Sequence, residues 1–187
     1  MKISSNDFII KEPRLIPYGV QSESYKKNFQ KGGSIRDISA LKYSIIRLRN
    51  YLILLLAYIA PSNKIRVLLN RWKGVNIADG AYIGMFVFID NAFPDYIYIE
   101  ENASINAGCM LVAHFNPMKH FRRTVLATVD PIIIKKGAML GVRVVVNQGV
   151  TVGEYSMVST GSVVTHNVNS YTIVRGNPVI EIGKVRI

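Results

Sequence analysis

The sequence contains three histidines, His114, His120 and His166, and these side chains are the best suited to chemistry near neutral pH. A neutral imidazole can accept a proton from a hydroxyl or an amine, and it can also bind a metal ion. His114 stands apart from the other two because it begins the longest interruption of a regular sequence repeat. We therefore place the functional site at His114 and expect the repeat to be the structure that positions it.

Branched aliphatic residues recur every six positions through the stretch 134–168. They are Ile134, Leu140, Val146, Val152, Val158 and Val164, and each is followed four positions later by a small or branched residue (Ala138, Val144, Val150, Ser156, Ser162 and Val168). A period of six fits neither a helix nor a long alternating strand. It predicts a solenoid of very short strands, in which only stacked neighbours can bury the apolar residue of each repeat.

The same period is present upstream in two sets, the first being Ile77, Ile83 and Ile89, and the second Ile99, Ile105 and Leu111. Four extra residues separate the two sets, which predicts a bulge near 93–96. About 17 extra residues follow the second set before the repeat resumes at Ile134, which predicts a long inserted loop over 114–130.

Length and composition predict one or at most two domains with a substantial core, because the 187 residues are 49% hydrophobic. The single cysteine, Cys109, permits no internal disulfide and falls where the repeat calls for a small inward side chain. No secretory signal is visible at residues 1–6, so we expect a cytoplasmic protein. The net charge of +11 predicts an acidic partner, but no nucleic-acid-binding motif accompanies it.

The segment before the repeat divides into a basic arm and two helices. Residues 1–36 show no sustained period and predict an extended arm. From 38 to 60 apolar residues follow a 3–4 spacing, with Ser39 as a possible cap and Pro61 as the stop. A second short helix is predicted over 62–72.

Both predicted helices carry apolar faces flanked by Lys and Arg. One interpretation is a helical cap on the open end of the solenoid, and the other is peripheral membrane contact through residues 38–73. The two are compatible. The predicted organisation is therefore an arm and helical cap over 1–73, a solenoid over 74–170 and a tail over 171–187. Residues 171–178 are expected to form a turn, and 179–187 a short strand or helix that packs on the coils.

Several sequence motifs that follow one another in a set order give the repeat a family resemblance. They are NQGVTVG at 147–153, TGSVVT at 160–165 and GNP at 176–178, with HFNP at 114–117. Over 74–178 the chain resembles the hexapeptide-repeat acyltransferases, and most of all the sugar O-acetyltransferases of the maltose, galactoside and colanic-acid type. The resemblance implies a mainly β fold, a left-handed parallel β-helix with three repeats in each triangular coil, and a homotrimer with a site at each subunit interface.

The resemblance also implies the chemistry, which is transfer of an acetyl group from acetyl-CoA to a sugar hydroxyl, with His114 as the general base and no metal ion. Family positions that contact the coenzyme match Val142, Thr160, Thr165 and His166, with Gly141 beside Val142. Arg175 and Lys184 are candidate partners for the phosphates of the coenzyme, because Lys and Arg supply charged donors.

The acceptor side is expected to be formed by Asp90 and Asn91 at the edge of the first bulge, where they could orient a hydroxyl or the base. His120, Arg122 and Arg123 on the inserted loop could contact a phosphate of a nucleotide-linked or lipid-linked sugar, or could simply solvate the loop. The basic helical front end favours an acceptor used in surface polysaccharide biosynthesis at the inner face of the membrane.

Three alternatives stay open at this point. N-acetylation of an amino sugar or of an antibiotic amine needs the same base. A γ-class carbonic anhydrase shares the fold, but its zinc site needs three histidines, and two of the three here share one loop. The last alternative is a solenoid that only binds or scaffolds.

Overall fold

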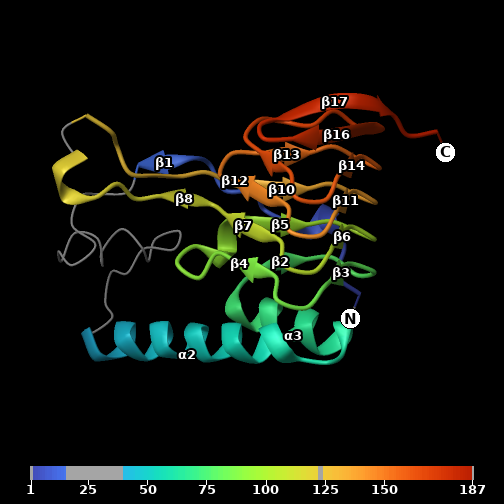
Figure 1. Cartoon of the computed structure of the whole chain (residues 1–187). Helices are drawn as coiled ribbons and strands as arrows, with labels where there is room; N and C mark the ends of the chain where they lie inside the picture. Colours follow the sequence, from blue (N-terminus) through green and yellow to red (C-terminus); the bar gives the residue numbers. More distant parts are fainter. Residues whose placement is uncertain (1, 16–39, 122–123, 187) are drawn as a thin grey trace.

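The computed structural model describes residues 2–15, 40–121 and 124–186. Most of them form a parallel β-helix with three faces, onto whose first turn two helices pack (Figure 1). The first face stacks β2 (Asn76–Ile77), β5 (Ile97–Ile99), β10 (Ile132–Ile134) and β13 (Thr151–Val152). The second stacks β3 (Tyr82–Ile83), β6 (Ser104–Ile105), β11 (Met139–Leu140), β14 (Met157–Val158) and β16 (Thr172–Gly176). The third stacks β4 (Phe88–Ile89), β7 (Met110–Val112), β12 (Val145–Asn147) and β15 (Val163–Val164).

The six-residue period predicted these strands correctly except for β16, and the expected left-handed parallel β-helix is confirmed. Leu140 pairs with Ile105 on one side and Val158 on the other, so equivalent residues of successive coils lie in register. All six aliphatic residues from Ile134 to Val164 are 0% exposed. Cys109 is also buried, and burial raises the pKa of its thiol to about 11, as suits a packing residue rather than a nucleophile.

Two glycines that directly follow inward aliphatic residues show how tightly the coils stack. A Cβ atom at Gly141 would lie 2.6 Å from the backbone nitrogen of Thr160, and one at Gly153 would lie 2.4 Å from that of Ser170. Both contacts are with backbone of the next coil, which cannot move aside. These positions therefore require glycine for close approach of the backbone rather than for an unusual φ angle.

The helices are α2 (Ala40–Ile59) and α3 (Asn63–Lys73), which pack on each other and on β2, β3 and β4. Both lie near their predicted places, although Ile38 and Ser39 fall outside the described residues. Ser62 precedes α3 in extended conformation, and Gly74 ends it with a φ of 110°, where glycine is favoured. The helices thus close the end of the coil at which the repeat begins (Figure 1).

The described part of the arm, residues 2–15, packs on its own coil. It forms the 3₁₀ turn η1 (Ser5–Asp7) and the strand β1 (Arg14–Leu15). The Glu101 carboxylate accepts hydrogen bonds from the backbone and hydroxyl of Ser5, both at 2.6 Å, and these lower its pKa to about 2. Tyr98 fixes the next stretch, because its hydroxyl accepts from Lys11 N–H at 2.9 Å and donates to the Ile9 carbonyl at 3.0 Å.

Both interruptions of the repeat lie where the spacing placed them. The first contains the 3₁₀ turn η2 (Pro94–Tyr96), whose flanking Phe93 and own Tyr96 are buried. The second contains β8 (His114–Phe115), η3 (Lys119–Phe121) and β9 (Thr128–Val129). Strand β9 pairs antiparallel with β8 and with β1, so the arm extends the sheet formed by the inserted loop (Figure 1).

The prediction of a turn over 171–178 was wrong. Residues 172–176 form β16, which continues the second face through pairing with β14, and β17 (Val179–Lys184) folds back antiparallel on β16. The period of six ends after Val168, so the spacing gave no signal for another strand. The strand expected somewhere in 179–187 is present as β17.

Candidate active site

His114 lies at the edge of the prism where the chain leaves the third face for the first. It begins β8 directly after β7, and its backbone register is fixed by pairing with Val129 of β9. The His114 Nδ1 atom is 2.5 Å from Asp90 Oδ2, and the imidazole packs against the Phe93 ring with centroids 5.3 Å apart. The His114 side chain is 28% exposed, so one side of the ring is held and the other reaches solvent.

Asp90 is the buried partner that holds this ring. It directly follows β4 one coil below, is 1% exposed, and accepts hydrogen bonds from the N–H groups of Ala92 (2.8 Å), Phe93 (3.2 Å) and Ala113 (3.0 Å). Burial raises the pKa of the Asp90 carboxyl, but the hydrogen bond and charge of His114 and the N–H groups of Ala92 and Phe93 outweigh it. The net pKa is below the usual range, so the group is a carboxylate at neutral pH.

The pairing fixes the tautomer of the histidine. An ionised carboxylate can only accept, so Nδ1 of His114 carries the proton that lies between the two groups. The neutral ring then has its lone pair on Nε2, the ring nitrogen that Asp90 does not hold. The arrangement is a general base with a fixed orientation, in which Asp90 also stabilises the imidazolium that forms after proton transfer.

Asp90→Asn tests this positioning role. We expect kcat to fall roughly 10- to 100-fold, because a hydrogen bond to a charged group contributes about 1.5–3 kcal/mol. KM for the acyl donor should stay within a few-fold, because Asp90 contacts the base and not the donor. Steady-state kinetics measure both constants. Asp95→Asn, in η2 and paired with Lys11, is the matched control; equal kcat in the two variants would contradict the role.

Lys73 is a residue that sequence reasoning did not connect with this site. It ends α3, is 2% exposed, and its Nζ donates to the carbonyl of Ile89 at 2.7 Å, next to Asp90 in the chain. Burial lowers the pKa of the Lys73 ammonium to about 8, against an opposing effect of the Asp90 carboxylate. No periodic signal marked it, because a lysine beside Arg71 and Trp72 resembles the flank of any surface helix.

A pH-dependent stability follows from this lowered pKa. An unfolded lysine has a pKa of about 10.4, so between pH 8 and 10.4 the unfolded chain holds a proton that the folded chain has released, and the Lys73 contribution to stability rises with pH. Lys73→Met lacks this ammonium group, so its free energy of unfolding should not show this rise. Relative to the wild type, we expect the free energy of unfolding of Lys73→Met to fall across this window, by at most about 1.4 kcal/mol per pH unit. Urea unfolding over pH measures it, with exposed Lys64→Met as the control that shows no such slope.

Two buried acceptors lie on the coils on either side of His114 at the same edge. Asn91 follows Asp90 on the coil before, and Gln148 follows β12 on the coil after. Neither Asn91 Oδ1 nor Gln148 Oε1 has a hydrogen-bond partner among the described residues, although Gln148 Nε2 donates to Thr128 at 2.8 Å. Both oxygens are buried, so they are unpaired acceptors close to His114 that a ligand does not reach in this conformation. Asn91 was predicted from the sequence and Gln148 was not.

The residues predicted for the coenzyme lie at two edges of the prism. Gly141, Val142 and Thr160 lie between the second and third faces, where Gly161 N–H donates to the Val142 carbonyl at 2.9 Å. Thr165 and His166 lie at the edge of His114, two coils farther on, which is roughly 10 Å at a strand spacing of about 4.8 Å. Within one chain these residues and His114 therefore do not form a single cleft.

The last two coenzyme candidates lie in the terminal hairpin, at the far end of the coil from the helices. Arg175 is exposed on β16, and Lys184 on β17 pairs with Glu181 at 2.6 Å. The ion pair offsets the charge of Lys184, which weakens its case as a phosphate partner relative to Arg175.

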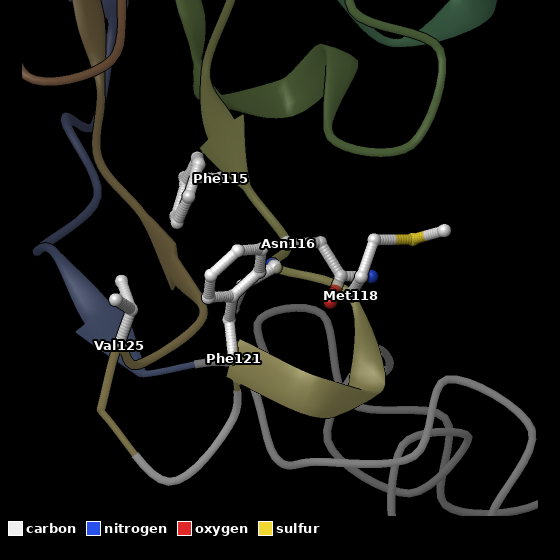
Figure 2. A pocket seen from close by; sticks show the side chains of 6 residues that line it. Phe115, Asn116, Met118, Phe121 and Val125 are labelled. Carbon is white, nitrogen blue, oxygen red and sulfur yellow. The ribbon is translucent and has the colours of Figure 1, made fainter.

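The inserted loop encloses an apolar pocket of about 440 Å³, lined by Phe115, Asn116, Pro117, Met118, Phe121 and Val125. Figure 2 shows Phe115, Phe121 and Val125 facing one another between the two limbs of the loop, with Met118 extending to the other side. His120 is exposed, and its ring packs on Phe121 at 4.3 Å between centroids. Arg122 and Arg123 fall outside the described residues. Of the three loop residues predicted to contact a phosphate, the structure therefore describes only His120.

The described residues contain neither a group of side chains arranged to bind a metal ion nor a helix suited to span a membrane. Within residues 2–15, 40–121 and 124–186, no group of three His, Cys, Asp or Glu side chains is arranged to hold a metal ion. Over the same residues, no helix combines the length and the apolar composition needed to cross a bilayer.

Comparison with known proteins shows which proteins this chain resembles. No family model matches the sequence. The chain is 48% identical over 46 residues to dTDP-3-amino-3,6-dideoxy-α-D-galactopyranose 3-N-acetyltransferase of Aneurinibacillus thermoaerophilus, a match covering 25% of this chain and 24% of that protein. It is 30% identical over 78 residues to 2,3,4,5-tetrahydropyridine-2,6-dicarboxylate N-acetyltransferase of Staphylococcus aureus, covering 42% and 29%. The matches thus span under a third of either relative.

Solved structures extend the likeness to most of the chain. A hexapeptide-repeat acetyltransferase of Vibrio cholerae, in complex with acetyl coenzyme A, superposes with a TM-score of 0.67 at 24% identity, covering 89% of this chain and 100% of that one. A maltose O-acetyltransferase of Clostridium difficile gives 0.62 at 17% identity, with coverage of 80% and 90%. The chain has the fold of the hexapeptide-repeat acetyltransferases, as its sequence phrases predicted.

Proposed function

We propose that this chain is an acetyl-CoA-dependent acetyltransferase that modifies a sugar hydroxyl, with His114 as the general base. The observation that carries the proposal is the His114–Asp90 pair, set at the edge of a coil whose solved neighbours include a complex with acetyl coenzyme A. A scaffold needs no base with a fixed tautomer. A carbonic anhydrase needs a set of metal ligands, and among the described residues no group of three His, Cys, Asp or Glu side chains is arranged to supply one.

The proposed reaction begins when a sugar hydroxyl donates its proton to Nε2 of His114. The hydroxyl oxygen bonds to the thioester carbonyl carbon of acetyl-CoA, and the carbon–sulfur bond then breaks. The leaving thiolate recovers the proton from the imidazolium, which restores the neutral ring. Asp90 holds Nδ1 throughout, so proton transfer occurs at Nε2 alone.

The residues proposed to hold acetyl-CoA are Gly141, Val142, Thr160, Thr165 and His166, with Arg175 and Lys184 toward its phosphates. Because they occupy two edges of one prism, we propose a homotrimer in which one edge of a subunit faces the His114 edge of the next. Outward apolar side chains on the third face (Phe88, Met110, Val145 and Val163) suit such an interface. Sedimentation equilibrium measures the assembly directly.

An amine acceptor is the second candidate. Both curated relatives named above are N-acetyltransferases, one of them acting on a nucleotide-linked amino sugar. Nε2 of His114, the ring nitrogen that Asp90 does not hold, can accept a proton from either O–H or N–H, so the base serves both acceptors. We favour the hydroxyl and a role in surface polysaccharide biosynthesis.

A thiol-release assay tests the proposal. Purified protein with acetyl-CoA is screened against free sugars, amino sugars and nucleotide-linked forms of both, and mass spectrometry locates the acetyl group. We expect release that depends on a sugar, with the product O-acetylated. A product acetylated on nitrogen selects the second candidate, and no release with any acceptor contradicts both.

A further inference from the structure

The outward side of α2 is apolar, which is the reverse of what a helix on the surface of a water-soluble domain shows. Ile45, Leu48, Leu52, Leu55, Leu56 and Ile59 are 43–66% exposed. Most of them follow a 3–4 spacing and so form one continuous stripe along the helix, which we call the α2 outer stripe. The inner side is buried through Ile53, Leu54 and Ala57. A helix that is apolar all round requires cover on both sides, and the coil supplies only one.

Charge identifies what kind of surface would cover the stripe. Every charged residue between 40 and 73 is a cation: Lys42, Arg47, Arg49, Lys64, Arg66, Arg71 and Lys73. Arg66 and Lys73 are buried and Arg71 pairs with Asp79, so these three do not add to the surface charge. Arg47 and Arg49 are exposed on the helix that carries the stripe. An apolar stripe bordered by arginines, in a chain of net charge +11, suits acyl chains and anionic headgroups. A second copy docked stripe to stripe would instead bring cations against cations, with no acidic residue in either segment.

The position of α2 on the coil suits a helix that lies along a membrane surface and does not cross the membrane. Its last turn is tied to the coil, because the Tyr58 carbonyl accepts from Phe86 N–H at 3.2 Å and the two rings lie 6.5 Å apart. Figure 1 shows α2 along the end of the molecule opposite β17. The helix can therefore rest in a membrane interface while the coil stays in water.

We propose that the α2 outer stripe docks this protein peripherally on a membrane that contains anionic lipid. The docking surface brings the coil to lipid-linked acceptors, but its existence does not depend on the acetyl transfer proposed above. Binding and catalysis can thus be tested separately.

Vesicle co-sedimentation of the full chain tests the proposal. Vesicles of phosphatidylcholine alone are compared with vesicles that also contain phosphatidylglycerol, at low and high salt. We expect the protein to pellet with the anionic vesicles and to be released as salt rises. Protein that stays in the supernatant with both vesicles overturns the proposal. Equal binding to both, without a salt effect, overturns the role of the cations.

Variants locate the surface. Ile59→Glu and Ile180→Glu are a matched pair, because both isoleucines are 66% exposed and lie at opposite ends of the coil. We expect Ile59→Glu to weaken vesicle partitioning roughly tenfold or more, and Ile180→Glu to bind as the wild type. Equal loss in both overturns the assignment to α2. Sedimentation equilibrium completes the test. If the wild type does not bind vesicles and the stripe variant dissociates an assembly that the wild type forms, the α2 outer stripe binds a second copy of the chain instead.

Discussion

His114→Ala should lower kcat for acetyl transfer by about 10²–10⁴-fold, the usual contribution of a positioned general base. The alanine leaves the thioester and the acceptor bound but provides no atom to take the hydroxyl proton. KM for acetyl-CoA should therefore stay within a few-fold of the wild type, because the lost interaction belongs to the transition state. Steady-state thiol release measures both constants.

The control for this variant is Thr124→Ala on the same inserted loop. Thr124 is exposed, and its hydroxyl bonds to the Phe121 carbonyl at 3.0 Å, so its loss should leave kcat unchanged. Circular dichroism spectra should superpose for the wild type and both variants. Undiminished kcat in His114→Ala would remove the base from the mechanism and leave the fold untouched.

Leu111→Ala should lower the free energy of unfolding by about 2–5 kcal/mol, the range for truncating a buried leucine where the surroundings cannot collapse. Leu111 is 0% exposed and stacks in register between Ile89 and Val146 of the adjacent coils. The hydrogen-bonded ladders above and below hold the backbone apart, so the cavity stays open. Urea unfolding at one protein concentration measures the change.

Ile180→Ala provides the comparison, because Ile180 is an aliphatic strand residue on β17, away from the third face, and is 66% exposed. Its truncation should cost about 1 kcal/mol or less. Equal losses in the two variants would mean that Leu111 is not packed in the core in solution.

Much of the fold could be predicted because stacked coils need the same types of residue at regular intervals along the sequence. Each coil repeats the last, so an inward residue such as Leu140 or Val152 recurs at a fixed interval, and both interruptions are visible as failures of that interval. Where the interval stops, prediction stopped too. Strand β16 was expected to be a turn, although it continues the second face, because its inward residues no longer keep the period of six.

The candidate site could be predicted only in part. His114 was found because it begins the longest interruption, and Asp90 because it ends the first set of repeats. The sequence allowed Asp90 to orient either a hydroxyl or the base, but it could not show that Asp90 holds Nδ1 of His114 at 2.5 Å, since 24 residues separate them and no period links them. Lys73 behind Asp90 and the unpaired oxygen of Gln148 were missed for the same reason.

The sequence by itself determined the architecture of this protein: a coil of six-residue strands, a loop that interrupts it at His114 and helices before it. It could do so because each of these depends on contacts that repeat along the chain. Only the tertiary structure decided that Glu101 anchors the arm, that Asp90 fixes the tautomer of His114 and that α2 keeps an apolar side turned outward. These contacts join residues that are distant in the chain, or depend on which side of a helix the coil covers, and neither leaves a period in the sequence.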